Sequence, residues 1–417
     1  SIDEHSYRHH ADGETKKMQD VSSFDLNTIG PEFIENPHPT LHALRAQAPV
    51  HFNRDGSAYL TRYKDVVKVY ASRDMLSDKK VEFGKKFGQC PLQQHHTTSL
   101  IFNDPPYHTV VRKLISSAFT PRKLAEFEPL IDGIVDRLLD RVQEMGTLDL
   151  IDDFAKVLPT EIISFMLGIP ETYRARLRDY SLAILGALDP VVPQARLDAG
   201  NQAVIEFSEI LNDLINHRRA NPDGATQGEV LESLIFGEHD GRRLTQEELI
   251  QNCIFLLNAG HETTTSMVGN SVGLLLDHPD EHRRLLADPS LITSAVEEFL
   301  RFESPLQIGN RLAGEDIDLG DVVLPKGTYI HTSIGAANRD PEQFPEPDRF
   351  DITRKPNRQI AFITGIHVCL GATLARVEGR IAIGKFVQRF PKLEQTGPRK
   401  RLPLARFRGY TGFPISV

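Results

Sequence analysis

Cysteine is scarce in this sequence, with three widely spaced residues and no CxxC pair: Cys90, Cys253 and Cys369. This usage excludes a disulfide framework and a zinc knuckle, so a cysteine with a chemical role acts alone. Long apolar runs are also missing, and residues 1–20 lack the apolar centre of a signal peptide. We therefore expect a cytoplasmic protein without a membrane partner.

Basic residues are in the minority, with 48 Lys and Arg against 57 Asp and Glu, and they form no long basic tract. Nucleic acid is therefore not an expected partner. No repeat, low-complexity linker or Pro-rich boundary divides the 417 residues. We expect a flexible polar leader over residues 1–25 and a single domain over residues 26–417.

The middle of the chain has the apolar periodicity of helices. One stripe stops at Gly146, where a helix is expected to end: Leu124, Phe127, Ile131, Ile134, Leu138 and Val142. Further helices are predicted over 150–168, 173–188 and 203–219, the last before a turn at 221–224. Thr245 and Glu248 form a capping box that opens a long helix reaching residue 276.

Strand patterns are short and lie near the two ends of the chain. Residues 49–63 read as two strands around Asp55-Gly56, and residues 306–335 are β-branched and Gly-rich. The expected fold class is therefore mainly α with small β-sheets.

The most specific segment runs from Phe362 to Gly371 and leads into a helical pattern. Cys369 is thus expected at a helix amino terminus, where the helix dipole and free N–H groups lower the pKa of a thiol. The resulting thiolate binds iron or attacks carbon. Because a lone cysteine is more often a buried structural residue, this interpretation depends on the rest of the chain.

This segment resembles the haem-binding loop of the cytochrome P-450 family, Phe-Gly-x-Gly-x-His/Arg-x-Cys-x-Gly. The resemblance implies haem b, with the cysteine thiolate as axial ligand to iron, and five positions match: Phe362, Gly365, His367, Cys369 and Gly371. Ile363 departs from the pattern, which has Gly there. Either the backbone is extended at Ile363, or this residue is a natural or engineered variant in a position that is costly for a β-branched side chain.

Two further segments resemble family motifs. Glu298 and Arg301 match a Glu-x-x-Arg helix, and the resemblance implies that Arg349, in FPEPDRF, joins them in a buried network behind the haem. Loss of a partner there is expected to abolish folding or haem retention. Residues 259–264 resemble the oxygen-activation signature, in which Thr263 donates a hydrogen bond at the oxygen site and Glu262 delivers protons from solvent. Gly260 and the threonines predict distorted helical hydrogen bonding there.

The haem propionates need cationic or hydrogen-bonding partners. The resemblance assigns these roles to His108, Arg112, Arg311 and His367. It also places seven residues beside the substrate pocket: Thr97, Thr98, Ser99, Phe102, Leu306, Gln307 and Ile308. This mixed lining predicts a small, partly polar substrate such as an aromatic acid or phenol, with terpenoid or larger scaffolds as the alternative.

The resemblance covers the chain from about residue 30 onward, with the motifs in family order. It implies the triangular P-450 fold and a monooxygenase that inserts one oxygen atom from O2 by hydroxylation or O-dealkylation. No reductase segment follows the Cys369 helix, so electrons are expected from a separate ferredoxin and ferredoxin reductase. A basic docking face is predicted from Arg112, Lys113, Arg122, Lys123, Arg376 and Arg380.

Two other functions stay open at this point. A haem-thiolate peroxygenase is expected to have an altered Glu262-Thr263 pair, which is intact in this sequence. A non-catalytic haem-binding sensor needs a second strong axial ligand, for which His261 is the candidate, although its offset from Thr263 argues against it.

Overall fold

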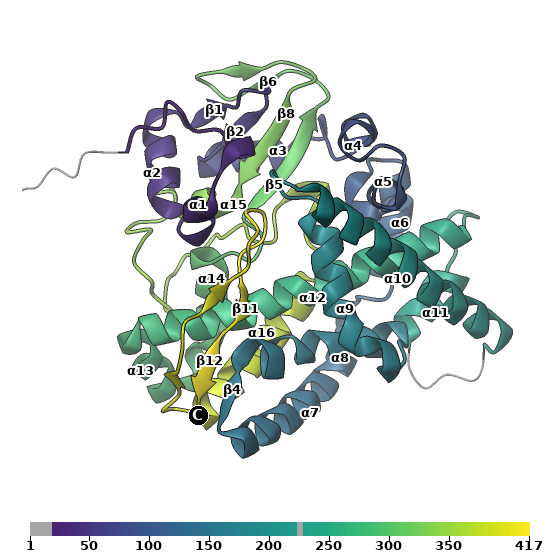
Figure 1. Cartoon of the computed structure of the whole chain (residues 1–417), viewed down its shortest axis with the longest axis vertical. Helices are drawn as coiled ribbons and strands as arrows, with labels where there is room; N and C mark the ends of the chain where they lie inside the picture. Colours follow the sequence, from purple (N-terminus) through teal and green to yellow (C-terminus); the bar gives the residue numbers. More distant parts are fainter. Residues whose placement is uncertain (1–18, 223–227) are drawn as a thin grey trace, which may run out of the picture.

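The structure is a computed structural model that describes residues 19–222 and 228–417. Residues 1–18 of the expected leader lie outside this range, as do Asp223 and Gly224 of the expected turn. In Figure 1 a sheet region with the first helices packs on a larger helical body. Within the described ranges, no helix is both long enough and apolar enough to cross a membrane.

A five-stranded sheet contains strands from both segments with a strand pattern, one early and one late in the chain. Its order is β1-β2-β8-β5-β3, with bounds Val50–Phe52, Ala58–Leu60, Tyr329–Ser333, Ile308–Ala313 and Met75–Leu76. The predicted hairpin is confirmed, because β1 and β2 pair antiparallel around Gly56, which has a φ of 83°. A smaller sheet has the order β4 (Thr147–Asp149), β12 (Pro414–Ser416) and β9 (Glu394–Gln395). In two-stranded sheets, β10 (Lys400–Arg401) pairs with β11 (Tyr410–Gly412), and β6 (Ile317–Asp318) pairs with β7 (Val323–Leu324).

Helices make up the rest of the regular structure. The first six are α1 (Pro31–Glu35), α2 (His38–Gln47), α3 (Tyr63–Ala71), α4 (Lys80–Phe87), α5 (Pro91–Thr98) and α6 (Tyr107–Ser116). The helical body contains α7 (Pro121–Met145), α8 (Val157–Leu167), α9 (Glu171–Gly186), α10 (Gln194–Ala220), α11 (Glu229–Phe236), α12 (Gln246–Asp277), α13 (Pro279–Ala287), α14 (Ile292–Phe302) and α16 (Ala372–Arg389). The short helix α15 (Ile334–Ala337) packs against α2, α3 and β5 in the sheet region. The fold is mainly helical with small sheets, as predicted.

The end of α7 and the start of α12 lie where the sequence predicts, whereas α10 begins at Gln194, before the predicted 203, and the helix predicted over 150–168 is divided into a π-helical turn, Ile151–Ala155, and α8. All six residues of the stripe on α7 are buried, and the helix ends at Gly146, whose φ of 68° suits glycine. Thr245 and Glu248 form both hydrogen bonds of the capping box at the start of α12. Helix α12 is continuous, so the expected distortion near Gly260 does not break it.

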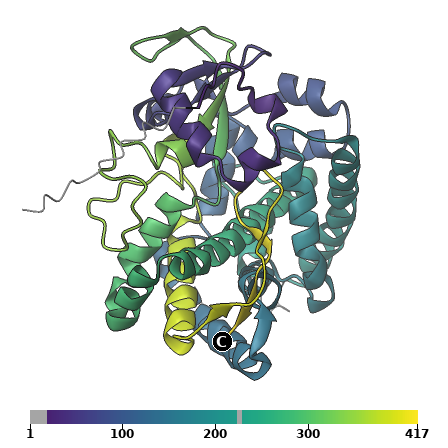
Figure 2. The same ribbon diagram turned by 60° about the vertical axis from the view of Figure 1, so that its left-hand side comes forward.

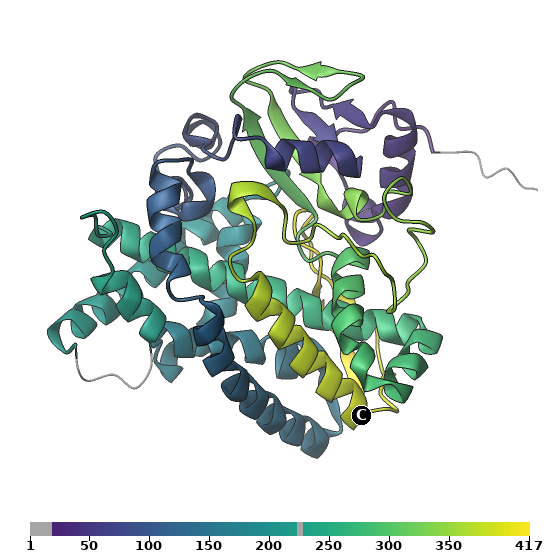
Figure 3. The ribbon, with the colours of Figure 1, turned by 180° about the vertical axis from the view of Figure 1, so that it is seen from behind.

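Helix α12 crosses the middle of the body and packs against α8, α9, α10 and α16. Figure 2 shows the C-terminal segment (yellow) descending along this body toward its lower edge. Seen from behind in Figure 3, α16 descends beside α7, and the loop that precedes α16 lies at its upper end. The loop of Cys369 therefore lies at the upper end of α16, where its 3-10 turn contacts α3.

Candidate active site

The loop of Cys369 is shaped by its backbone hydrogen bonds. The Cys369 N–H donates to the Phe362 carbonyl at 3.0 Å, and a single 3-10 turn covers Gly365–His367. Gly371 caps the amino terminus of α16, so Cys369 lies two residues before that cap. The prediction that Cys369 lies at a helix amino terminus is confirmed.

The protonation of the Cys369 thiol differs from the sequence expectation. Burial raises the pKa of the thiol and outweighs the Gly371 N–H and the guanidiniums of Arg112 and Arg376, which act in the other direction. The expected lowering of the pKa was wrong because the sequence does not reveal how deep the loop lies. The side chain is solvent-accessible and lines a cavity, so its sulfur is open to a bound group. A metal ion bound there replaces the thiol proton.

A large interior cavity of about 310 Å³ adjoins Cys369. Its wall is formed by the Cys369 loop, the middle of α12, the end of α5, the start of β5 and the turn between β10 and β11. Most lining groups are apolar, and these include Phe102, Ile163, Leu185, Phe255, Leu306 and Phe407. The cavity therefore suits a large, mostly apolar group held over the sulfur.

Ile363 is one of the few non-glycine residues with a positive φ in the described chain, at 52°. The extended alternative considered for this position is therefore wrong, and the β-branched side chain occupies a backbone region that favours glycine. Its side chain lines the cavity and packs against the apolar cluster beneath the sheet. This packing offsets part of the backbone strain.

Gly365 cannot be replaced without moving the loop. Its φ is 77°, and a Cβ built on it would lie 2.0 Å from the Tyr70 carbonyl oxygen. We expect Gly365→Ala to lower the free energy of unfolding by about 3 kcal/mol and to reduce haem content, because backbone on both sides must shift. Denaturant unfolding measures this change.

Gly133→Ala is the matched control for that substitution. Gly133 is exposed on α7 with nothing within 4 Å of an added Cβ, so alanine there is expected to stabilise the helix by up to about 1 kcal/mol. Equal effects of the two alanines would contradict the role given to Gly365.

The four proposed propionate partners meet beside the loop. The rings of His108 and His367 lie 4.1 Å apart, and Arg112 donates to the Val368 carbonyl at 2.7 Å. Arg311 is buried and donates to the neighbouring Asn310 carbonyl at 2.8 Å. Neither guanidinium forms a salt bridge with a carboxylate of the described chain.

The cationic members of this cluster are the guanidiniums of Arg112 and Arg311, which have no salt-bridge partner in the described chain, although Asp104 is near enough to act on the pKa values of His108 and Arg311. The buried Nε2 atoms of His108 and His367 have no hydrogen-bond partner among the described residues. Burial and the neighbouring Arg112 lower the pKa of His108 to about 4, and burial lowers the pKa of Arg311. Unpaired buried cations and donors are costly, so the cluster fits the two propionates of a haem.

Thr263 lies on α12 and lines the same cavity as Cys369. Its hydroxyl donates to the Ala259 carbonyl at 2.6 Å, which is the backbone hydrogen bond predicted for these threonines. The resemblance implied that Thr263 donates at the oxygen site. In this structure its proton is already engaged, so the hydroxyl offers acceptor lone pairs to the cavity.

Glu262 does not line the cavity, although it adjoins Thr263 in the sequence. It is buried, with one carboxylate oxygen 3.4 Å from Nε of Arg178 on α9 and the other without a partner in the described chain. Burial raises the pKa of Glu262 despite that guanidinium. Arg178 also lies 3.6 Å from Asp152, whose side chain is 53% exposed, so a chain of polar groups connects Glu262 with solvent.

A buried ion-pair network lies behind the loop. Glu298 and Arg301 on α14 form a two-bond pair at 2.8 Å, and both side chains are fully buried. The third member is Arg354, whose Nε lies 3.3 Å from Glu298. The prediction of Arg349 in this place was wrong: its guanidinium is 60% exposed and pairs with Glu346, and only its carbonyl accepts from Arg301.

The predicted substrate residues are divided by the structure. Ser99, Phe102, Leu306 and Ile308 line the cavity, whereas Thr97, Thr98 and Gln307 do not. Thr97 donates to the carbonyl of Gln93 on its own helix. Sequence reasoning missed several lining groups, because they lie in segments without a motif: His95, His96, Asn258, Arg406 and Glu378.

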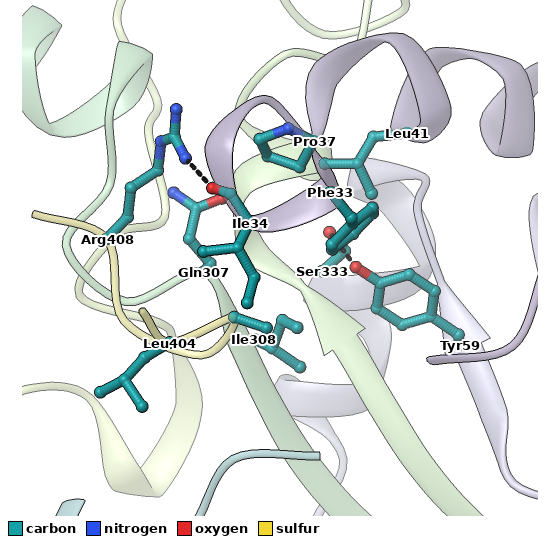
Figure 4. Close-up of a pocket in the computed structure, with 11 residues that line it drawn as sticks. Phe33, Ile34, Pro37, Leu41, Tyr59, Gln307, Ile308, Ser333, Leu404 and Arg408 are labelled. Carbon is teal, nitrogen blue, oxygen red and sulfur yellow. Dashed lines mark hydrogen bonds between the residues drawn. The ribbon is translucent and has the colours of Figure 1, made fainter. Parts of the chain in front are cut away.

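Gln307 faces a different, much smaller hollow beneath α1 and α2 (Figure 4). Its volume is about 10 Å³, which has room for little more than a water molecule. Tyr59 donates to Ser333 there at 3.1 Å, and Arg408 donates to the Ile34 carbonyl at 2.9 Å (Figure 4). This hollow is a packing defect between the N-terminal helices and the sheet.

Cys369 lines a largely apolar cavity, and two guanidiniums without salt-bridge partners in the described chain lie beside it. Together these features define a haem-thiolate site. The cytochrome P450 family model matches residues 50–407. Vitamin D(3) 25-hydroxylase of Pseudonocardia autotrophica is 40% identical over 87% of this chain and 88% of its own. The biotin biosynthesis cytochrome P450 of Bacillus subtilis is 36% identical over 94% of this chain and 98% of its own.

Solved structures agree with the sequence relatives. P450BioI, crystallised with an acyl carrier protein ligated to hexadec-9Z-enoic acid, superimposes with a TM-score of 0.87. It is 34% identical, and the match covers 93% of this chain and 100% of P450BioI. The chain belongs to the cytochrome P450 family. It is a cytochrome P450 monooxygenase with a haem-thiolate cofactor.

Proposed function

We propose that this protein inserts one oxygen atom from O2 into a small organic substrate, by hydroxylation or O-dealkylation. The observation that carries the proposal is the placement of Thr263 and Cys369 on the walls of one cavity that is otherwise largely apolar. Haem b would be held there by the Cys369 thiolate and would supply the oxygen chemistry. The cluster of His108, Arg112, Arg311 and His367 would hold the propionates.

The protein's own contribution to the reaction is to hold and move protons. Thr263 presents a hydroxyl to the cavity, and its hydrogen bond to Ala259 fixes the orientation of that hydroxyl. Glu262 lies on the far side of the same turn and reaches solvent through Arg178 and Asp152. We assign Glu262 to proton supply and Thr263, whose free lone pairs accept a hydrogen bond, to holding the proton-donating group in place beside the cavity.

Thr263→Ala tests this assignment. We expect electron consumption to continue while product per electron pair falls at least about tenfold and hydrogen peroxide is released, because the hydroxyl no longer positions a proton. Thr265→Ala is the matched control, since Thr265 makes the same bond to a carbonyl of α12 but does not line the cavity. Unchanged coupling in Thr263→Ala would remove its role.

The two other functions are less well supported. A peroxygenase has no need for the polar chain from Asp152 to Glu262. A sensor with His261 as second axial ligand is disfavoured, because His261 does not line the cavity and its Nε2 lies 2.7 Å from the Thr160 hydroxyl.

We propose that electrons come from a separate acidic ferredoxin and its reductase, docking near the Cys369 loop. Ile366 and Val368 are exposed on this loop, and Arg112 joins α6 to it. Lys113 and Arg122 are also exposed, but Arg122 is paired with Glu126 and Arg376 with Glu297, so these two arginines add less free charge. The rate of haem reduction by such a ferredoxin is expected to fall as salt rises, and a rate independent of salt would contradict this docking.

A further inference from the structure

Arg406 is a further cation on the cavity wall, in addition to the residues assigned to the propionates. It lies in the turn between β10 and β11, and its side chain is buried. Nε donates to the Leu188 carbonyl at 2.8 Å, and Nη1 donates to the Ile308 carbonyl at 2.7 Å. Both acceptors are neutral, and no carboxylate of the described chain lies within salt-bridge distance of the guanidinium.

The neighbouring carboxylate of Asp189 does not balance this charge. Its oxygens accept the backbone N–H groups of Ala405 and Arg406 at 3.1 and 2.9 Å. Its ion-pair partner is Arg196, at 3.9 Å. Asp189 therefore holds the turn in place, and the Arg406 guanidinium remains a buried cation without an anionic partner.

Arg406 is separate from the propionate cluster. After burial, the largest influences on the pKa values of His108 and His367 are Arg112 and Arg311, respectively. Arg406 comes from the turn between β10 and β11, whereas the propionate partners come from α6, β5 and the Cys369 loop. Arg406 is therefore a further cation on the cavity wall, beyond the four residues assigned to the propionates.

Two neutral polar groups on the cavity wall also lack partners. Nε2 of His96 and both polar atoms of the Asn258 side chain are buried without a hydrogen bond in the described chain. Such groups are rare in folded proteins, and leaving them unpaired is costly. They come from α5 and α12, on two different walls of the cavity. Apolar side chains such as Phe102, Phe255 and Phe407 form much of the remaining lining.

We propose that the substrate is an apolar carboxylic acid whose carboxylate binds Arg406, with Asn258 and His96 as further hydrogen-bond partners. This inference rests on the proposed function and names its substrate class. Arginine binds a carboxylate in a planar, charge-assisted geometry, and the apolar walls accommodate the hydrocarbon part. The unpaired guanidinium then acquires the anion that the protein itself does not supply.

The test compares ligands that differ only in their charged end. Haem-loaded protein is titrated with dodecanoic acid, methyl dodecanoate and dodecylamine, and in parallel with 4-phenylbutanoic acid and its methyl ester. The spin-state change of the haem reports binding. At least one acid is expected to bind at least about tenfold tighter than its ester, and the amine is expected not to shift the haem to high spin.

Variants identify the group responsible. Arg406→Gln is expected to weaken binding of the acid about tenfold and binding of the ester less than about twofold. Arg406→Lys is expected to restore part of the preference, because it keeps the charge but loses the planar geometry. Arg54→Gln is the control, since it removes a cation whose side chain is 77% exposed and far from the cavity lining.

Three results would overturn the proposal. These are equal binding of acid and ester by the unaltered protein, no binding of any acid, and equal weakening of acid and ester in Arg406→Gln. The last result would give Arg406 a structural role only, as hydrogen-bond donor to the Leu188 and Ile308 carbonyls. If Arg406→Gln does not fold, the ligand series on the unaltered protein still decides. Imidazole binding and the carbon monoxide spectrum show independently whether the haem site itself is formed.

Discussion

Arg301→Ala is expected to lower the free energy of unfolding by about 3–5 kcal/mol and to yield protein with little haem. Arg301 forms a two-bond pair with Glu298 and also donates to the carbonyls of Asn338, Pro347 and Arg349, at 2.8 to 3.2 Å. Its loss removes both bonds of the pair from the buried Glu298 carboxylate, which keeps only longer bonds such as that from Arg354 at 3.3 Å, and takes the Arg301 donor away from the Asn338 and Pro347 carbonyls. The chain that leads to the Cys369 loop loses its anchor on α14.

The effect is large compared with a typical stability of about 5–15 kcal/mol. Arg301→Lys is expected to be intermediate, because a lysine keeps the charge but cannot form the two-bond pair. Arg349→Ala is the matched control and is expected to change the stability by less than about 0.5 kcal/mol, since its guanidinium is mostly exposed. Denaturant midpoints and haem-to-protein ratios measure both. A similar effect of the two alanines would contradict the network.

Glu378 is expected to contribute a fall in stability as pH rises from about 4.5 to about 8, opposite in sign to the contribution of buried histidines such as His108, whose pKa is lowered. Glu378 lies on α16 and is buried at the cavity, with one carboxyl oxygen lacking a partner in the described chain. Burial raises its pKa to about 8, although a hydrogen bond with Thr264 acts in the other direction. The folded protein therefore keeps a proton that the unfolded chain releases.

The sign follows from this difference in bound protons. Below the unfolded pKa both states are protonated and the full stability is present, and above it each pH unit costs up to about 1.4 kcal/mol until the folded pKa is reached. Relative to the unaltered protein, Glu378→Gln is expected to gain stability at about pH 8 compared with about pH 4.5, while Glu144→Gln, on the exposed face of α7, is expected to leave the pH dependence unchanged. Unfolding curves at several pH values measure the slopes. Identical slopes for Glu378→Gln and the unaltered protein would contradict this account.

The features predicted correctly from the sequence are local ones. The capping box at Thr245, the stop at Gly146, the hairpin at Gly56 and the place of Cys369 before α16 each depend on a few neighbouring residues. Such patterns determine backbone geometry within one or two turns, so they can be read without knowledge of the tertiary structure.

The features that were wrong or missed depend on distant contacts. Arg349 and Arg354 lie in the same irregular segment, where no periodicity shows which guanidinium points inward to Glu298. The pKa of Cys369 depends on burial by other elements. Arg406 lies in a turn without a motif. The burial of Glu378 was weakly indicated by the sequence. Glu378 lies one turn after Leu374 and next to Val377, on the apolar side of its helix.

The central claim is that Cys369 binds haem iron as a thiolate, although burial raises the pKa of its free thiol. The most direct measurement is the absorption spectrum of the reduced, haem-loaded protein under carbon monoxide. We expect the strongly red-shifted Soret band of thiolate ligation, and we expect it to be lost in Cys369→His, which places a neutral nitrogen ligand at the same position. An unshifted band in correctly folded, haem-loaded protein would contradict the account.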